Sequence, residues 1–198
     1  MALAKLRFSA LQDAGRLTAI LAPYARDSVA VWACEAPTRA QLAQHMEALG
    51  RAGLPVLVAE DPSGLLGFAF AEPFAVRRGA LWSAQVQAYL APDERRRGIG
   101  SALVNAVCDL LSAQGYCACY ACVSHPHPES EAFFAALGFA EQARLPAAGF
   151  KLGLWLDLSI CERPLRARTA RPVPPMAVGA LDGAYVRGVF ARRAKDIR

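Results

Sequence analysis

One stretch of the chain limits its possible folds more than any other. An apolar run over residues 81–91 leads into a basic turn, residues 95–100 (RRRGIG), and the turn leads into residues 101–113, whose leucines and valines recur at helical spacing. A strand, a tight turn and a helix in this order bring free backbone N–H groups and the positive end of a helix dipole to one point. The stretch therefore predicts a turn that binds phosphate groups.

This turn does not fit two other phosphate-binding patterns. A dinucleotide fingerprint needs a third glycine and an acidic residue after the next strand, and the chain has neither. A Walker loop needs a Gly-Lys-Ser or Gly-Lys-Thr sequence, which is also missing. An ordinary solvated turn stays open, but Gly98 and Gly100 would let a ligand approach the backbone closely. The pattern favours a pyrophosphate cradle of the kind that holds coenzyme A.

The other elements predict an α/β (α+β) architecture in which a mixed sheet is flanked by helices. Strands are predicted over residues 5–10, 55–60, 65–71, 81–91, 116–123, 139–144 and 150–161, and helices over residues 12–24, 38–49, 101–113 and 129–136. The first helix is expected to end near Pro23, and Thr38 with Gln41 is typical of a capping box. Hairpins and helical crossovers in one chain exclude a fully parallel sheet.

The chain is predicted to form one domain, residues 1–163, followed by a basic tail, residues 164–198. Four prolines in the tail are typical of a linker, and residues 181–197 predict a weak helix that is disordered or docks on the core or a partner. From Arg163 onward the chain holds nine of its 22 Lys and Arg residues and two of its 17 acidic residues. The net charge of +5 therefore comes from the tail, and we expect no nucleic-acid partner for the core.

Neither a membrane span nor a metal site is expected. No apolar run approaches about 18 residues, and the first residues do not resemble a leader, so the predicted compartment is the cytoplasm. Of the six cysteines, four lie between Cys108 and Cys122, and His125 and His127 follow them. Their spacing fits no common zinc pattern, so small buried side chains are the favoured interpretation and a metal site the lesser one.

The pattern Arg95-x-x-Gly98-x-Gly100 after the strand resembles the coenzyme A motif of the GNAT acetyltransferase superfamily. Residues 54–61, 67–68, 72–74, 137–139, 149–151 and 155–157 resemble the phosphinothricin-type N-acetyltransferases within it. The resemblance covers residues 6–165 and implies the GNAT acyl-CoA N-acyltransferase fold, with a mostly antiparallel sheet. It also implies acetyl-CoA as cofactor, a primary amine of a small molecule or amino-acid-like substrate as acceptor, and a homodimer as a possible assembly.

The resemblance also implies site residues. The pantetheine arm of the cofactor pairs with one strand in that family, and the pyrophosphate lies on the turn that follows. The cofactor-binding residues implied here are Ala88, Tyr89, Leu90, Arg95, Arg96, Arg97, Gly98, Ile99, Gly100, Ser101, His127, Ser130 and Phe134. The substrate-binding residues implied are Glu35, Trp82 and Gln85, and the catalytic positions are Gln85 and Tyr89.

The chain departs from the family pattern at the positions that move protons. The position of the usual glutamate base is Gln85, and a carboxamide cannot accept a proton at neutral pH. The position of a tyrosine or histidine acid is Phe134, which has no proton to give. Other groups would then have to relay the proton, and the candidates are Glu72, Tyr89, Tyr120 and His127.

Further departures leave three functions open. Ala80, Leu81 and Leu154 stand where relatives often carry polar residues, which argues against a small anionic amino acid as substrate. The first function is a working N-acetyltransferase for a different amine. The second is a catalytically impaired coenzyme A-binding or regulatory protein, because both proton-transfer positions are changed together. The third is a structural role in a complex that the basic tail contacts.

Overall fold

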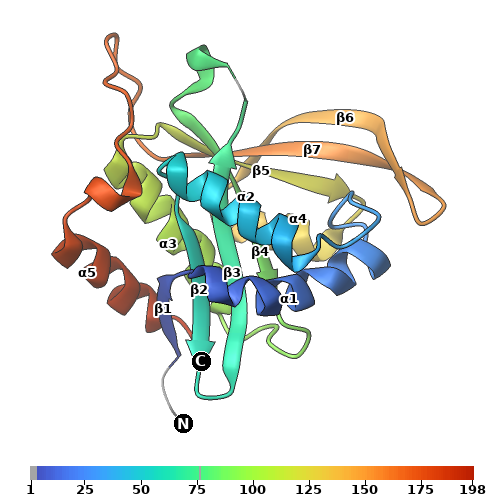
Figure 1. Ribbon diagram of the computed structural model, residues 1–198. Helices are drawn as coiled ribbons and strands as arrows, with labels where there is room; N and C mark the ends of the chain where they lie inside the picture. Colours follow the sequence, from blue (N-terminus) through green and yellow to red (C-terminus); the bar gives the residue numbers. More distant parts are fainter. Residues whose placement is uncertain (1–3, 76) are drawn as a thin grey trace.

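The computed structural model describes residues 4–75 and 77–198, and its centre is a sheet of seven strands (Figure 1). The strands are β1 (Lys5–Phe8), β2 (Val56–Asp61), β3 (Gly64–Pro73), β4 (Ser83–Leu90), β5 (Ala118–His125), β6 (Ala140–Lys151) and β7 (Leu154–Pro164). Their order in the sheet is β1-β2-β3-β4-β5-β7-β6. Only β4 and β5 pair in parallel, so the predicted mixed, mostly antiparallel sheet is confirmed.

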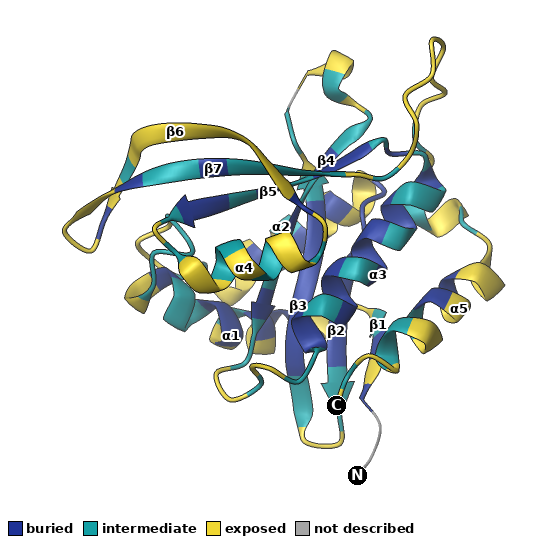
Figure 2. Ribbon diagram, turned by 180° about the vertical axis from the view of Figure 1, so that it is seen from behind, coloured by how far each residue is buried: buried dark blue, intermediate teal, exposed yellow. Residues whose placement is uncertain are grey.

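Helices cover both faces of this sheet (Figures 1 and 2). They are α1 (Ala14–Asp27), α2 (Arg39–Arg51), α3 (Ile99–Gln114), α4 (Pro128–Ala136) and α5 (Gly183–Ala194), with short 3-10 turns at Leu11–Asp13, Arg78–Ala80 and Val178–Ala180. Helices α1 and α2 lie on one face, and α3 lies on the other against β2, β3 and β4. The core between these layers contains fully buried side chains such as Leu17, Phe68 and Leu103.

Strands β4 and β5 separate soon after they begin, and this separation positions the site. They pair only from Ser83–Gln85 to Ala118–Tyr120. Beyond Gln85 the edge of β4 that faces β5 has no strand partner, whereas its other edge stays paired with β3 up to Leu90. Unpaired backbone groups in a sheet must find another partner. The gap therefore offers a strand edge to an extended ligand, and the chain continues from this strand through a turn into α3.

Two local predictions were wrong at element ends. Helix α1 continues past Pro23 to Asp27, and the chain does not turn between residues 144 and 150. Instead β6 passes a register shift between Leu145 and Gly149, and the hairpin turns at Leu152-Gly153. Both turn residues have positive φ, of 50° and 78°, the combination that a tight two-residue hairpin turn requires.

The tail docks on the domain instead of extending from it. Helix α5 packs against α3 and β1, with Val186 and Val189 buried in that contact. Arg193 donates two hydrogen bonds to the carboxylate of Asp109 on α3, at 2.9 and 3.0 Å. Of the alternatives open for residues 181–197, the structure shows the docked helix (Figure 2). Within the described residues, no helix has the length and apolarity needed to span a bilayer.

Candidate active site

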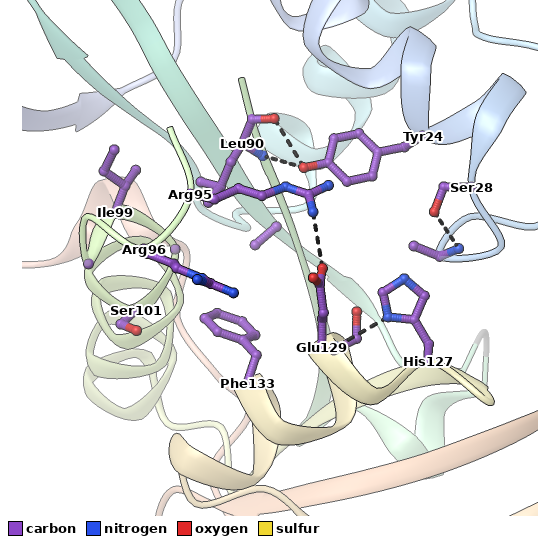
Figure 3. A pocket seen from close by; sticks show the side chains of 15 residues that line it. Tyr24, Ser28, Leu90, Arg95, Arg96, Ile99, Ser101, His127, Glu129 and Phe133 are labelled. Atoms are coloured by element: carbon purple, nitrogen blue, oxygen red, sulfur yellow. Dashed lines mark hydrogen bonds and ion pairs between the residues drawn. The ribbon is translucent and has the colours of Figure 1, made fainter. Parts of the chain in front are cut away.

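Three adjoining cavities follow the open edge of β4. The first, which we call the phosphate pocket, is about 420 Å³ and lies between the turn before α3 and the start of α4 (Figure 3). The second, the central pocket, is about 330 Å³ and lies in the gap between β4 and β5. The third, the outer pocket, is about 470 Å³ and lies under α2. The central and outer pockets share Val31, Gln87 and Tyr89 as walls, so they adjoin each other, and we call the two together the recess.

The phosphate pocket contains free amides at the start of α3. Helical hydrogen bonding begins with the N–H of Ala102, which donates to the carbonyl of Gly98. The N–H groups of the three residues before Ala102 therefore have no helical partner, and they stand at the positive end of the helix dipole. Arg95 and Arg96 line the same cavity, where Arg95 is paired with Glu129 at 3.0 Å (Figure 3). Phosphate oxygens fit this set of donors.

The two glycines of the turn lie close to other parts of the protein. Gly98 has φ of +80°, and a Cβ there would collide with the carbonyl oxygen of Asp196 in the tail. A Cβ on Gly100 would lie 3.2 Å from the ring of Phe133 on α4, which is a tight contact. Their missing side chains thus make room for the tail and for α4.

Most of the residues predicted to hold the cofactor meet at these cavities. The predicted residues that line the phosphate pocket are Ala88, Leu90, Arg95, Arg96, Gly98, Ile99, Gly100, Ser101, His127 and Ser130. Tyr89 and Phe134 line the central pocket instead. Arg97 is not among the lining residues of either cavity, because its guanidinium pairs with Glu94 and donates to the carbonyl of Arg198.

Tyr24 is a site residue that the sequence did not reveal. The N–H of Ala91 donates to the carbonyl of Leu66 on β3, so the backbone groups of Leu90 face the gap instead. There the hydroxyl of Tyr24 accepts from the N–H of Leu90 at 3.2 Å and donates to its carbonyl at 3.1 Å (Figure 3). Leu90 is thus paired with a side chain of α1, and Ala88 is the lining residue left to offer a strand edge.

The central pocket contains the two positions where a base and an acid were expected. Gln85 lines it, and the carboxamide oxygen of Gln85 accepts a hydrogen bond from the thiol of Cys122 at 3.5 Å. Phe134 lines it with an apolar ring. Tyr89 is buried and its hydroxyl donates to Oε1 of Gln87 at 2.5 Å. Burial raises the pKa of Tyr89, so this hydroxyl keeps its proton at neutral pH.

The two other predicted substrate residues lie far from each other. Glu35 lines the outer pocket, beside His45 and Gln41. Trp82 lines none of the three pockets. It precedes β4, and its indole N–H donates to the carbonyl of Val173 in the tail at 2.8 Å. The structure therefore brings Glu35 to the recess with Gln85 and assigns Trp82 to tail docking.

A loop held by three buried contacts closes one side of the recess. Residues 28–37 join α1 to α2, and the indole N–H of Trp32 in this loop donates to the hydroxyl of Ser124 at 2.6 Å. Nζ of Lys151 donates to the carbonyl of Val31 and, at 3.4 Å, to that of Tyr24. Burial lowers the pKa of Lys151. None of the three contacts was predictable from sequence, since each joins residues more than 90 positions apart.

Metal binding finds no support at these cavities. Across residues 4–75 and 77–198, no group of three or more His, Cys, Asp or Glu side chains converges on a point that could hold an ion. Cys122 lines the central pocket and Cys119 is buried in the core, so the cysteines point to different environments.

Comparison with known proteins agrees with this geometry. Residues 18–139 match the model of the acetyltransferase (GNAT) family. The chain belongs to the GNAT family. A phosphinothricin N-acetyltransferase of Alcaligenes faecalis is 30% identical over 78% of this chain and 79% of its own length. An L-methionine sulfoximine/L-methionine sulfone acetyltransferase of Pseudomonas aeruginosa is 26% identical over 85% of this chain and 99% of its own length.

A solved GNAT structure resembles this chain along most of its length. The phosphinothricin acetyltransferase of Sinorhizobium meliloti, in complex with acetyl-CoA, superposes with a TM-score of 0.81. It is 31% identical in sequence, and the match covers 89% of this chain and 98% of that one. The predicted GNAT fold is thereby confirmed.

Proposed function

We propose that this GNAT protein is an acetyl-CoA-dependent N-acetyltransferase that acts on a primary amine of a small molecule or amino-acid-like substrate. One observation carries the proposal: the phosphate, central and outer pockets adjoin one another in a row along β4. A ligand with a pyrophosphate, an extended arm and a reactive end fits such a path. The relatives named above, which acetylate amino-acid analogues, support the same chemistry.

The residues along the path fit acetyl-CoA. The free amides of Ile99, Gly100 and Ser101 would hold the pyrophosphate together with Arg95 and Arg96. The backbone of Ala88 would pair with the pantetheine arm. When bound, the cofactor supplies an acetyl thioester, which is the acyl group to be transferred. The recess would hold the amine beside the thioester, and such positioning alone supplies much of the rate of a two-substrate reaction.

A second candidate function is a coenzyme A-binding or regulatory protein with impaired catalysis. The observation in its favour is the chemistry of the central pocket, where Gln85 and Phe134 can neither accept nor give a proton. The two candidates share the cofactor site and differ only in whether an amine is acetylated.

Calorimetry with acetyl-CoA tests the shared part first. We expect binding by the wild type, weakening of at least about tenfold in Arg95→Glu, because a cation of the phosphate pocket becomes an anion, and no change in Arg51→Glu. Arg51 is a matched control, since it is an exposed arginine on α2, away from the phosphate pocket. Absence of wild-type binding by folded protein would exclude both candidates. A panel of primary amines, followed by release of free thiol, then separates an enzyme from a binding protein.

A homodimer is part of the proposal. Most of β6 and the end of the β6–β7 hairpin are coloured as exposed in Figure 2. The large apolar side chains exposed on this hairpin are Leu145, Phe150, Leu152, Leu154 and Trp155. Phe150 and Trp155 pack against each other at 5.3 Å, and exposed apolar pairs of this kind are typical of protein–protein contacts. Light scattering should give the mass of two chains for the wild type and of one for Trp155→Glu, with Val173→Glu as an exposed control. Wild-type protein that stays monomeric at high concentration would exclude the dimer.

A further inference from the structure

A transferase of this kind needs a proton acceptor at the amine, because an ammonium ion has no electron pair with which to attack a thioester. Five titratable side chains line the central and outer pockets: Tyr24, Glu35, His45, Tyr89 and Cys122. The hydroxyl of Tyr24 is bonded to the backbone of Leu90. Burial raises the pKa of Tyr89 and of Cys122, so both keep their protons at neutral pH. Glu35 is exposed on the loop before α2. The remaining candidates for the proton acceptor are His45 and the carboxylate that it faces, that of Glu72.

Glu72 lies where a carboxylate can serve both pockets. It is on β3 directly opposite Gln85 of β4, so the two side chains project from the same face of the sheet, with Cβ atoms about 5 Å apart. Its charge contributes to the raised pKa of Tyr89 and of Cys122, which line the central pocket. Its Oε2 is 3.7 Å from Nε2 of His45, which lines the outer pocket. The carboxylate itself lines neither cavity, but Gln85 and Gln87 of the central pocket and His45 of the outer pocket stand next to it.

A fixed hydrogen-bond chain holds this carboxylate in place. The hydroxyl of Tyr89 donates to Oε1 of Gln87, which leaves the amide N–H₂ of Gln87 on the opposite side. That N–H₂ donates to Oε1 of Glu72. Because Tyr89 keeps its proton, the orientation of the Gln87 amide is defined, and so is one oxygen of Glu72. The second oxygen is free to face His45 and the recess. Glu72 is about one quarter exposed and His45 less than half, so both remain within reach of solvent or substrate.

We infer that Glu72 is the proton acceptor for the amine, acting directly or over one water, and that His45 passes the proton on to solvent. This inference rests on the proposed transferase function. In the family pattern the base is a glutamate at the position of Gln85 on β4. In this chain the carboxylate is on the neighbouring strand β3, on the same face of the sheet and directly opposite Gln85.

The proton and electron balance follows from this assignment. One proton of the substrate ammonium goes to the carboxylate of Glu72, which leaves a neutral amine. The nitrogen lone pair forms a bond to the thioester carbonyl carbon, and the carbon–sulfur bond breaks with its electron pair on sulfur. A second proton leaves nitrogen and ends on that sulfur, giving a free thiol. The third proton stays on the amide product. Glu72 returns to a carboxylate when its proton leaves through His45, which is nearer to the surface.

A swap of the carboxylate between strands tests the inference. With an amine that the wild type acetylates, Glu72→Gln should lower kcat about 100-fold or more at neutral pH, the range of a lost general base. Adding Gln85→Glu to that variant should restore kcat to within about tenfold, because it returns a carboxylate to the same face one strand away. Glu47→Gln is the matched control, since Glu47 is on α2 like His45 but is exposed and pairs with Arg51.

The pH profile separates a proton acceptor from a merely structural residue. The ratio of the wild-type kcat to the kcat of Glu72→Gln should fall towards one as the pH rises to about 10, where the amine loses its proton to solvent. A ratio that stays constant with pH, or a kcat of Glu72→Gln equal to that of the wild type, would overturn the inference and leave the transferase function intact. Wild-type protein that binds acetyl-CoA yet acetylates no amine would overturn both. Acetyl-CoA affinity, measured in every variant, should stay unchanged and shows that the variants fold.

Discussion

The contact between the tail and the phosphate-binding turn can be tested by adding one methyl group. Gly98→Ala introduces two costs: a left-handed backbone, at φ of +80°, and a collision with the carbonyl oxygen of Asp196. A left-handed conformation costs an L-residue about 1–2 kcal/mol. Relief of the collision requires the tail end to move, which breaks the bond from the N–H of Arg198 to the carbonyl of Arg97, at 2.9 Å, and the return bond from the Arg97 guanidinium, at 3.1 Å.

The magnitude of the second cost follows from these two hydrogen bonds. At about 0.5–1.5 kcal/mol each, their loss amounts to about 1–3 kcal/mol. Gly138→Ala is the matched control, because Gly138 has φ of +82° and open space where a Cβ would be. The free energy of unfolding should therefore fall by about 1–2 kcal/mol in Gly138→Ala. It should fall by about 2–5 kcal/mol in Gly98→Ala, the sum of both costs.

Urea unfolding of a double-mutant cycle measures the contact itself. Removal of residues 196–198 takes away the collision, so Gly98→Ala in the shortened chain should cost no more than Gly138→Ala does. A Gly98→Ala cost that is unchanged by the truncation would refute the idea that the tail sets the requirement for glycine. An equal cost of the two glycine substitutions in the full chain would refute it as well. Acetyl-CoA affinity should fall in Gly98→Ala, since the turn has to shift.

Three further predictions concern contacts that surround the site. Although burial opposes its ionisation, the pKa of Asp109 is lowered by hydrogen bonds from Arg193 and Arg192, so its contribution to stability is lost as the pH falls. Asp109→Asn should therefore lower stability above about pH 4 and make the loss on acidification smaller, because the share of Asp109 is removed, as acid titration of the unfolding free energy would show. Lys151→Met should cost about 1–3 kcal/mol in urea unfolding, because it removes the donor to the carbonyls of Val31 in the loop and of Tyr24 at the end of α1. It should also raise KM for the amine, and an unchanged KM would show that the loop does not contact the substrate. Tyr24→Phe removes the hydroxyl that pairs with the backbone of Leu90, and it should change acetyl-CoA affinity by at least about threefold in calorimetry. An unchanged affinity would show that Leu90 does not contact the cofactor.

The fold was predictable where its signals are local. The strand–turn–helix around Gly98 needs only neighbouring residues to be recognised, and the Thr38–Gln41 capping box has the two hydrogen bonds that its sequence predicts. The end of α1 was not predictable from Pro23, because a proline lowers helix stability but does not outweigh packing on both sides of it. Ala25 is buried beyond that proline, and the ring of Tyr24 packs edge-on against Tyr89 at 5.3 Å.

The site was predictable in its backbone and less so in its side chains. Most residues of the predicted turn line the phosphate pocket, since a motif places them as a unit. Trp82 was assigned to the substrate by resemblance, yet a tail residue 91 positions away accepts its N–H. Glu72 was one of four open candidates for proton transfer, because the sequence alone does not state which residues of β3 and β4 stand opposite each other. Strand register decides that question.

The docked tail also has a practical consequence for anyone who handles this protein. The backbone of Arg198 is hydrogen-bonded to Arg97 in the phosphate-binding turn, so any peptide joined after Arg198 would begin beside the cofactor pocket. An affinity tag there would add its own charges and bulk next to Arg95 and Arg96. Binding assays with carboxy-terminally tagged protein would therefore report on the tag as well as on the pocket.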